Sequence, residues 1–135
     1  MVVISLAAKY RKFENDLAGA IKALLFYLKR PSAYFEVFLV SDDIIRRLNR
    51  VFKKKDKATN VLSFPFKDFP HPDKLTRPLG EIYLAPDYIK KHGESLEALV
   101  VHGLLHLLGY THKNRHDRIK MERLEKKLFA KINLV

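Results

Sequence analysis

Three histidines carry most of the chemistry that this sequence offers. His102, His106 and His112 lie in the apolar segment VVHGLLHLLGYTH, residues 100–112. Two helical residues four positions apart project from the same face, so His102 and His106 can converge on one ion. Gly109 lets the chain leave the helix, and His112 follows where a turning chain can bring it back. Three neutral imidazoles with one open position form the ligand set of a catalytic zinc site.

The alternative is that these histidines are ordinary core or surface residues. The segment around them is apolar, and a buried imidazole without a partner costs about 1–3 kcal/mol. Because three of the six histidines fall at this spacing, a metal site is the favoured interpretation. The spacing is similar to the metzincin signature H-E-x-x-H-x-x-G-x-x-H. Gly103 stands where those proteases have the Glu that acts as general base, so a metallopeptidase is the less favoured hypothesis.

The composition narrows the classes of protein and partner. The chain has 135 residues, no cysteine, and 26 Lys and Arg against 15 Asp and Glu, a net charge of +11. Without thiolates, a metal must be held by His, Asp or Glu, and the absence of disulfides fits a reducing compartment. The positive charge favours a polyanion such as RNA, DNA or an anionic membrane, and the alternative is a surface charged for solubility.

The chain is expected to be one cytoplasmic domain with no membrane association. Its first apolar run, residues 2–8, is short and follows no basic residue, so it predicts a strand and not a signal peptide. No apolar run approaches the length of a membrane span. The length and the absence of a linker predict a single domain over residues 1–135.

The elements that position the histidines follow from hydrophobic periodicity. We expect an α+β fold, with a small mixed sheet of about four strands and about five helices, and a metzincin-like metal site. Strands are predicted at residues 2–8, 34–40, 60–66 and 80–85, with Pro65 marking an edge strand. Helices are predicted at 14–29, after the N-cap Ser41, from the N-cap Ser95 to about 108, and at 115–132, and residues 69–78 are predicted to be a loop.

The helix after Ser41 leads into a strongly basic segment. Its predicted inward face is formed by Ile44, Ile45, Leu48, Val51 and Phe52. Between positions 46 and 57 there are seven basic side chains and one acidic one, either a phosphate-binding patch or a solvated helix face. Phe64 and Phe66 in the following strand have the chemistry to stack bases, but alternating aromatics in a strand are more often core.

Three stretches of the sequence resemble the YbeY-type 16S rRNA maturation factors. The family hallmark is close to H-G-x-L-H-L-x-G-Y-D-H, and residues 102–112 read HGLLHLLGYTH. Residues 48–66, LNRVFKKKDKATNVLSFPF, match a second family stretch, and residues 80–82 match its G-[DE]-I strand. Thr111 stands where Asp is usual, and Lys53 stands where the family usually has Arg.

The resemblance implies a metal-dependent endoribonuclease that acts on single-stranded RNA in 16S rRNA maturation and ribosome biogenesis. It implies that His102, His106 and His112 hold one Zn²⁺, although other divalent ions suit the same ligands. It points to Lys53 as a catalytic residue, with a single point charge in place of the bidentate arginine grip. The expected partners are ribosomal RNA and the small ribosomal subunit, and the expected RNA-binding residues are Arg46, Arg50, Lys54, Lys55 and Lys57.

Two questions stay open at this point. The departures at Lys53 and Thr111 motivate an alternative function, a ribosome-assembly RNA-binding protein whose zinc is structural. The partners that orient the ligand imidazoles are also open, and His116, Asp117 and Glu122 are the candidates.

Overall fold

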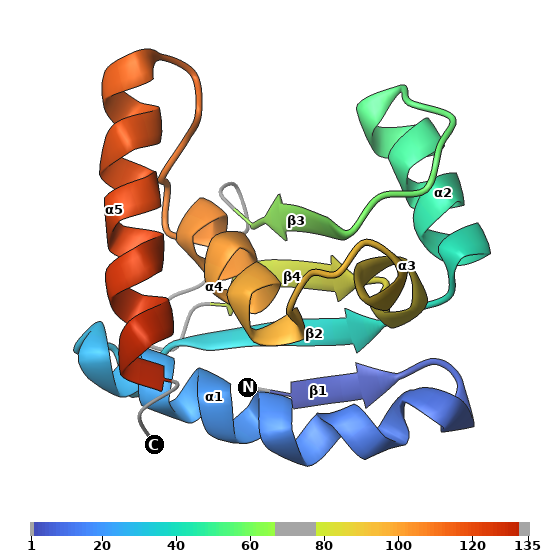
Figure 1. The fold of residues 1–135 in the computed structure, drawn as a ribbon, viewed down its shortest axis with the longest axis horizontal. Helices are drawn as coiled ribbons and strands as arrows, with labels where there is room; N and C mark the ends of the chain where they lie inside the picture. The colour runs from blue at the N-terminus through green and yellow to red at the C-terminus, as the bar shows by residue number, and fades with distance from the viewer. Residues whose placement is uncertain (1, 67–77, 133–135) are drawn as a thin grey trace.

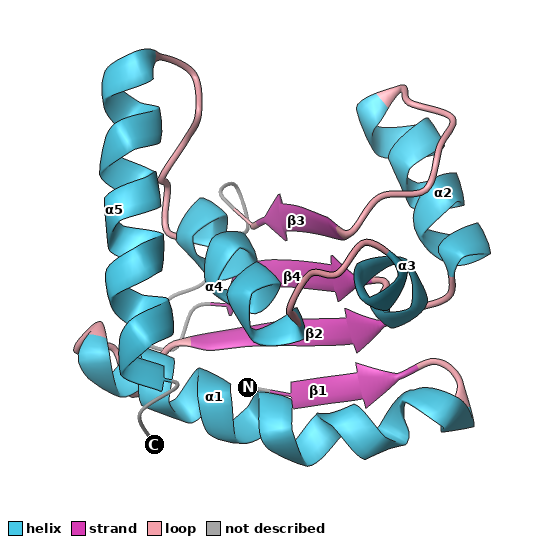
Figure 2. Ribbon diagram, viewed as in Figure 1, coloured by secondary structure: helices cyan, strands magenta, loops and turns pink. Residues whose placement is uncertain are grey.

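The fold is a four-stranded mixed sheet packed with helices, which confirms the predicted α+β class. The computed structural model describes residues 2–66 and 78–132. Its strands are β1 (Val2–Ser5), β2 (Tyr34–Leu39), β3 (Val61–Pro65) and β4 (Pro78–Leu84). Its helices are the 3₁₀ helix η1 (Ala8–Phe13), α1 (Glu14–Tyr27), α2 (Asp42–Lys53), α3 (Pro86–Lys91), α4 (Leu96–Leu107) and α5 (Arg115–Ile132) (Figures 1 and 2).

The strands lie in the order β1-β2-β4-β3. β1, β2 and β4 are parallel, and β3 pairs antiparallel with β4 so that Ser63 faces Ile82. β3 is therefore an edge strand, as Pro65 predicted, and Pro65 pairs with Gly80 across the sheet. A proline is tolerated there because one side of an edge strand has no ladder to donate to.

Two apolar clusters hold the helices against the sheet. In β2 the buried side chains are Phe35, Val37 and Leu39, which alternate along the strand and pack with α1, α4 and α5 in the larger cluster. α2 packs in the smaller cluster, where Ile45 is fully buried near Phe38, Phe64 and Tyr83. α4 is buried on most of its sides and crosses β3 and β4 (Figure 1). The sheet thereby fixes the position of the helix that carries two of the histidines.

Gly80 allows the closest approach between β4 and β3. Its φ of +148° lies in a region that other residues rarely adopt. A Cβ atom at this position would lie 2.3 Å from the Phe64 carbonyl oxygen and 2.8 Å from both Leu107 Cδ2 and Pro65 Cα. Glycine at residue 80 is therefore required by the contact of β4 with the edge strand and with α4.

Several predicted elements are confirmed and others need correction. α5 has the predicted bounds, and the hydroxyl oxygens of Ser41 and Ser95 accept hydrogen bonds from the amides of Ile44 and Ala98. The first strand is shorter than predicted, because η1 begins at residue 8, and α3 was not predicted at all. Pro78 was placed in the loop but begins β4, while residues 69–77 of that loop lie outside the described residues.

The prediction that the last turn of α2 faces inward is wrong. Val51 is 55% exposed and Phe52 is 62% exposed. The physical reason is the position of the helix, whose C-terminal end extends past the edge strand β3 (Figure 1). The last turn of α2 therefore meets the sheet only at its edge, where Phe52 contacts Phe64 of β3. None of the helices in the described part of the chain combines the length and apolar character needed to cross a membrane.

Candidate metal centre

The three histidines meet at one place in the fold. His102 and His106 project from adjacent turns of α4, and His112 lies in the turn that follows Gly109, whose φ is +102°. One ligand nitrogen from each histidine lies within 4.8 Å of the other two. The His112 ring centroid is 5.1 Å from that of His102 and 5.0 Å from that of His106. The sequence prediction that these side chains converge is confirmed, and the group could hold a metal ion.

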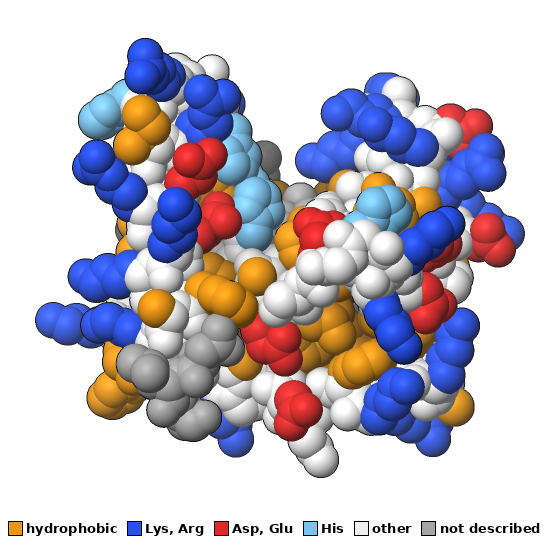
Figure 3. Space-filling model, viewed as in Figure 1, with side chains coloured by type: hydrophobic (Ala, Val, Ile, Leu, Met, Phe, Trp, Pro, Cys, Tyr) orange, Lys and Arg blue, Asp and Glu red, His pale blue; other side chains and the backbone are white. Residues whose placement is uncertain are grey.

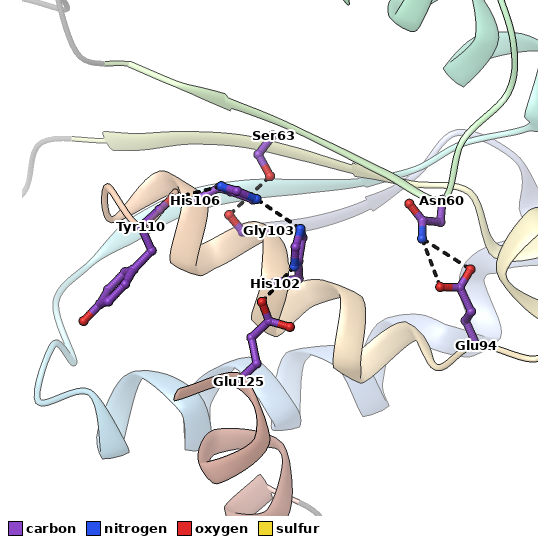
Figure 4. Close-up of polar contacts among 8 residues, drawn as sticks. All are labelled: Asn60, Ser63, Glu94, His102, Gly103, His106, Tyr110 and Glu125. Carbon is purple, nitrogen blue, oxygen red and sulfur yellow. Dashed lines mark hydrogen bonds and ion pairs between the residues drawn. The ribbon is translucent and has the colours of Figure 1, made fainter. Parts of the chain in front are cut away.

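Hydrogen bonds set which nitrogen of each helical histidine points into the site. His106 Nδ1 donates to the carbonyl oxygen of Tyr110 at 3.0 Å, and His102 Nδ1 donates to Glu125 Oε1 at 2.9 Å (Figure 4). In a neutral imidazole the other nitrogen then carries a lone pair. The two Nε2 atoms face each other at 3.0 Å. Two facing lone pairs repel unless a cation lies between them.

The geometry of this pair fits a tetrahedral zinc ion. Zinc–nitrogen bonds of about 2.0–2.1 Å place two tetrahedral ligand nitrogens about 3.3 Å apart. The observed separation between the His102 and His106 Nε2 atoms is 3.0 Å, so a small adjustment of either ring accommodates the ion. The donor set, three imidazoles without a thiolate, also suits other divalent transition metals.

The protein environment favours the neutral form of His106. Burial of the ring lowers its pKa below the ordinary value of 6.5, and electrostatic interactions with His102, His112 and Lys53 lower it further. The hydrogen bond to the Tyr110 carbonyl opposes these effects. Metals bind the neutral imidazole, so a lowered pKa favours binding by reducing the competition from protons.

Gly103 brings α4 close to the sheet. A Cβ atom at this position would lie 3.0 Å from Ile82 Cγ2 and 3.1 Å from Ser63 Oγ. The Ser63 hydroxyl donates to the Gly103 carbonyl oxygen at 3.2 Å, which links α4 to β3 (Figure 4). The residue that replaces the metzincin glutamate therefore lies against the sheet. A glutamate at this position would crowd the side chains of Ile82 and Ser63.

Glu125 is a functional residue that the sequence reasoning missed. It lies on α5 and holds the Nδ1 atom of His102, while the candidates His116 and Glu122 are exposed. Asp117, the third candidate, accepts hydrogen bonds from Thr111 Oγ1 at 3.2 Å and from Asn114, in the turn that carries the last histidine. The helical pattern of the sequence could have indicated this residue, because position 125 lies on the side of α5 that faces the core.

Replacing Glu125 with alanine is expected to weaken zinc binding by about 10–100-fold, the usual effect of losing the partner of a ligating histidine. The carboxylate orients the His102 ring and makes its Nε2 atom more basic. Zinc affinity, measured by titration against a chelating dye, tests this. The matched control is Glu122→Ala, an exposed glutamate one turn earlier on the same helix. Equal affinity in the two variants would contradict the role of Glu125.

Two of the three histidines, His102 and His106, line a cleft together with Lys53. The cleft has a volume of about 310 Å³ and includes Lys53, Ser63, His102, His106 and Thr111 among its lining residues. Among the described residues that line it, none is a carboxylate. Figure 3 shows the hollow between the α5 and α2 sides of the molecule, with histidines and acidic side chains on the α5 side and Lys and Arg side chains around both rims. Such a cleft suits an anionic substrate.

Lys53 is the last residue of α2, and its ammonium lies 5.4 Å from the centre of the Phe64 ring. From the sequence, Lys53 was a candidate site residue only because of the resemblance to the YbeY-type family. In the structure, Lys53 lines the same cleft as His102 and His106. A phosphate bound at the metal site would therefore have a cation in the same cleft.

Of the other residues expected to bind RNA, Arg46 and Arg50 lie on α2, and Lys54, Lys55 and Lys57 follow Lys53 in an anchored loop. Arg50, Lys54, Lys55 and Lys57 are exposed, as is Arg46, whose guanidinium pairs with Asp56 at 2.9 Å. An exposed ion pair is worth little, so the pair with Asp56 does not prevent Arg46 from meeting a phosphate. The Asn49 side chain is almost fully buried and donates to the Lys57 carbonyl oxygen at 2.9 Å. This hydrogen bond holds the basic loop in place.

The fold and the site together define a small α+β protein with a three-histidine centre of the metal-binding type. The sequence model of the Endoribonuclease YbeY family matches residues 4–133 of the chain. The chain therefore belongs to the Endoribonuclease YbeY family.

Individual relatives support the same family. The chain is 39% identical to Endoribonuclease YbeY of Myxococcus xanthus over 93% of its own length, and it spans 45% of that relative. It is 34% identical to Endoribonuclease YbeY of Wolbachia sp. subsp. Drosophila simulans, with 88% of this chain and 83% of the relative covered. The solution structure of TM1509 from Thermotoga maritima matches with a TM-score of 0.63 and 28% identity, over 98% of this chain and 89% of that one.

Proposed function

We propose that this chain is a zinc-dependent endoribonuclease that cleaves single-stranded RNA in the maturation of 16S rRNA. Its membership of the Endoribonuclease YbeY family supports the class of reaction, the hydrolysis of RNA phosphodiester bonds. The observation that carries the proposal is the convergence of His102, His106 and His112 on one place, beside a cleft that His102 and His106 line together with Lys53. A metal ion and a cationic side chain are two groups that stabilise the negative charge of a phosphodiester as it is hydrolysed.

Each residue has a defined part in the proposal. The three histidines hold the ion, and Glu125 and the Tyr110 carbonyl orient two of the rings. Bound zinc polarises a phosphoryl oxygen and makes water a nucleophile near neutral pH. Lys53 stabilises the negative charge that develops on the phosphate during cleavage.

The proposed substrate is the unpaired part of a ribosomal RNA. The residues proposed to bind the RNA backbone are exposed: Arg46 and Arg50 on α2, and Lys54, Lys55 and Lys57 in the segment that follows the helix. Proteins recognise single-stranded RNA through backbone charge together with bases that are free to stack. We further propose that the chain acts on the small ribosomal subunit in the cytoplasm. Residues 1–135 are proposed to form one hydrolase domain. The absence of cysteine from the sequence is compatible with that reducing compartment.

Metal removal tests the proposed function. Purified protein is expected to contain about one zinc ion per chain when it is loaded, and to cleave single-stranded RNA. A strong chelator should stop cleavage, and added zinc should restore it. RNA binding that continues without metal-dependent cleavage would instead indicate an assembly factor with a structural ion. Hydrolysis of casein by the loaded protein would indicate a peptidase and overturn the proposal.

A further inference from the structure

An exposed aromatic side chain lies beside the cleft and has no part in the site described above. Phe52, in the last turn of α2, is 62% exposed although it precedes Lys53, which lines the cleft. Burying a phenylalanine side chain is worth about 1.5–3 kcal/mol, and the fold leaves most of this ring in water. Single exposed apolar residues are common in proteins. Phe52 differs from other exposed apolar residues in the aromatic and basic side chains around it.

The Phe52 ring contacts an aromatic side chain of the edge strand β3. Its centroid lies 5.3 Å from that of Phe64 with an angle of 65° between the ring planes, an edge contact. Phe64 in turn has the Lys53 ammonium 5.4 Å from its centre and makes an edge contact with Tyr83 at 5.7 Å. The edge contact with Phe64 supports Phe52, and Phe52 remains largely exposed to solvent.

The charges next to this ring favour a nucleic acid over an apolar partner. Arg50, Lys53 and Lys54 lie within two residues of Phe52 and are all exposed. An apolar protein partner would have to desolvate these cations, whereas a nucleotide offers them a phosphate and offers the ring a base. Stacking on an aromatic ring requires an unpaired base, because the faces of paired bases are already covered by their neighbours.

We propose that Phe52 forms a stacking site for an unpaired nucleobase of an RNA whose adjacent phosphate lies in the cleft beside Lys53. This inference rests on the proposed function and adds a subsite to it. It gives a physical reason for a preference for single strands, since the base must leave a duplex to reach the ring. Replacing an aromatic residue that stacks on a base with alanine lowers affinity by about 5–150-fold.

The chain offers a matched control in Phe26. This residue is 74% exposed and makes an edge contact with Tyr27 at 5.7 Å, and the Lys131 ammonium lies 4.9 Å from the Tyr27 ring. The arrangement is thus similar to that of Phe52, Phe64 and Lys53. Phe26 belongs to α1, which packs beside β1 at the opposite edge of the sheet from β3 (Figure 1).

The experiment measures RNA binding in the presence of chelator, so that no cleavage occurs. The probe is a short single-stranded RNA that carries the fluorescent base 2-aminopurine. We expect Phe52→Ala to weaken binding about tenfold and to abolish the fluorescence change that stacking causes, with Phe52→Tyr retaining both. Phe26→Ala should bind as the wild type does, and thermal unfolding should be alike in all variants. For the same RNA as a duplex, Phe52→Ala should change affinity little.

The outcomes separate the two proposals. If the wild type binds single-stranded RNA and Phe52→Ala binds equally well, the stacking site is overturned and the proposed function stands. An equal loss in Phe26→Ala also overturns it, because the effect would then be unrelated to the cleft. If the wild type binds no RNA, both proposals fall. If zinc-dependent cleavage is absent but binding depends on Phe52, only the enzymatic proposal falls.

Discussion

RNA cleavage is expected to be lost when His106 is replaced with alanine, and bound zinc is expected to be lost with it. The variant removes one of two Nε2 atoms that face each other at 3.0 Å, so two imidazoles remain where three are needed. The loss of zinc affinity should exceed the 10–100-fold expected for a residue that only orients a ligand. Metal content by mass spectrometry and the rate of cleavage of single-stranded RNA measure the two effects.

His92→Ala is the control for this variant. The His92 Nδ1 atom also bonds a carbonyl oxygen four residues away, that of Tyr88 at 2.8 Å, but the ring is exposed on α3 and does not line the cleft. His92→Ala should keep zinc and activity. If His106→Ala retained full metal content and normal cleavage while folded, the histidines would have no role as ligands.

The second large effect is on folding. Gly80→Ala is expected to lower the free energy of unfolding by about 3–5 kcal/mol, from backbone strain and overpacking together. The new methyl group would lie 2.3 Å from the Phe64 carbonyl oxygen at a φ of +148°. To relieve these close contacts, β3 would have to move away from β4. This movement would also disturb the hydrogen bond from Ser63 of β3 to the Gly103 carbonyl oxygen of α4, the helix that carries two of the histidines. Urea denaturation followed by circular dichroism measures the change.

Gly19→Ala tests whether the effect is specific. Gly19 lies within α1, and a Cβ atom there would meet no other atom within 4 Å. Alanine is a better helix former than glycine, so this variant should be more stable by about 0.5–1 kcal/mol. Equal destabilisation by the two substitutions would show that the close contact at residue 80 is not the cause.

The sequence was most informative where one helix controls the geometry. The spacing of His102 and His106 requires only helical periodicity, and Gly109 marked where the chain turns toward His112. The bounds of α5 followed from a long and regular apolar stripe. These features depend on residues close together in sequence, so local patterns were sufficient to predict them.

Features that depend on tertiary contacts were not predictable in this way. α3 has six residues, too few to show a helical period, and it owes its helix to the burial of Pro86 and Ile89. The pairing of Glu125 with His102 joins residues 23 positions apart. The exposure of Phe52 follows from the way α2 extends past β3, which the apolar pattern of the helix cannot reveal.

The two apolar clusters of the core determine whether the protein can be studied without its metal ion. None of the described side chains in either cluster is a histidine, and aliphatic and aromatic residues such as Leu104, Leu105 and Ile82 fill the space below the site. Small zinc domains, by contrast, collapse only around their metal. We therefore expect this protein to stay folded when its metal ion is removed. One preparation can then be reloaded with zinc, nickel or manganese in turn.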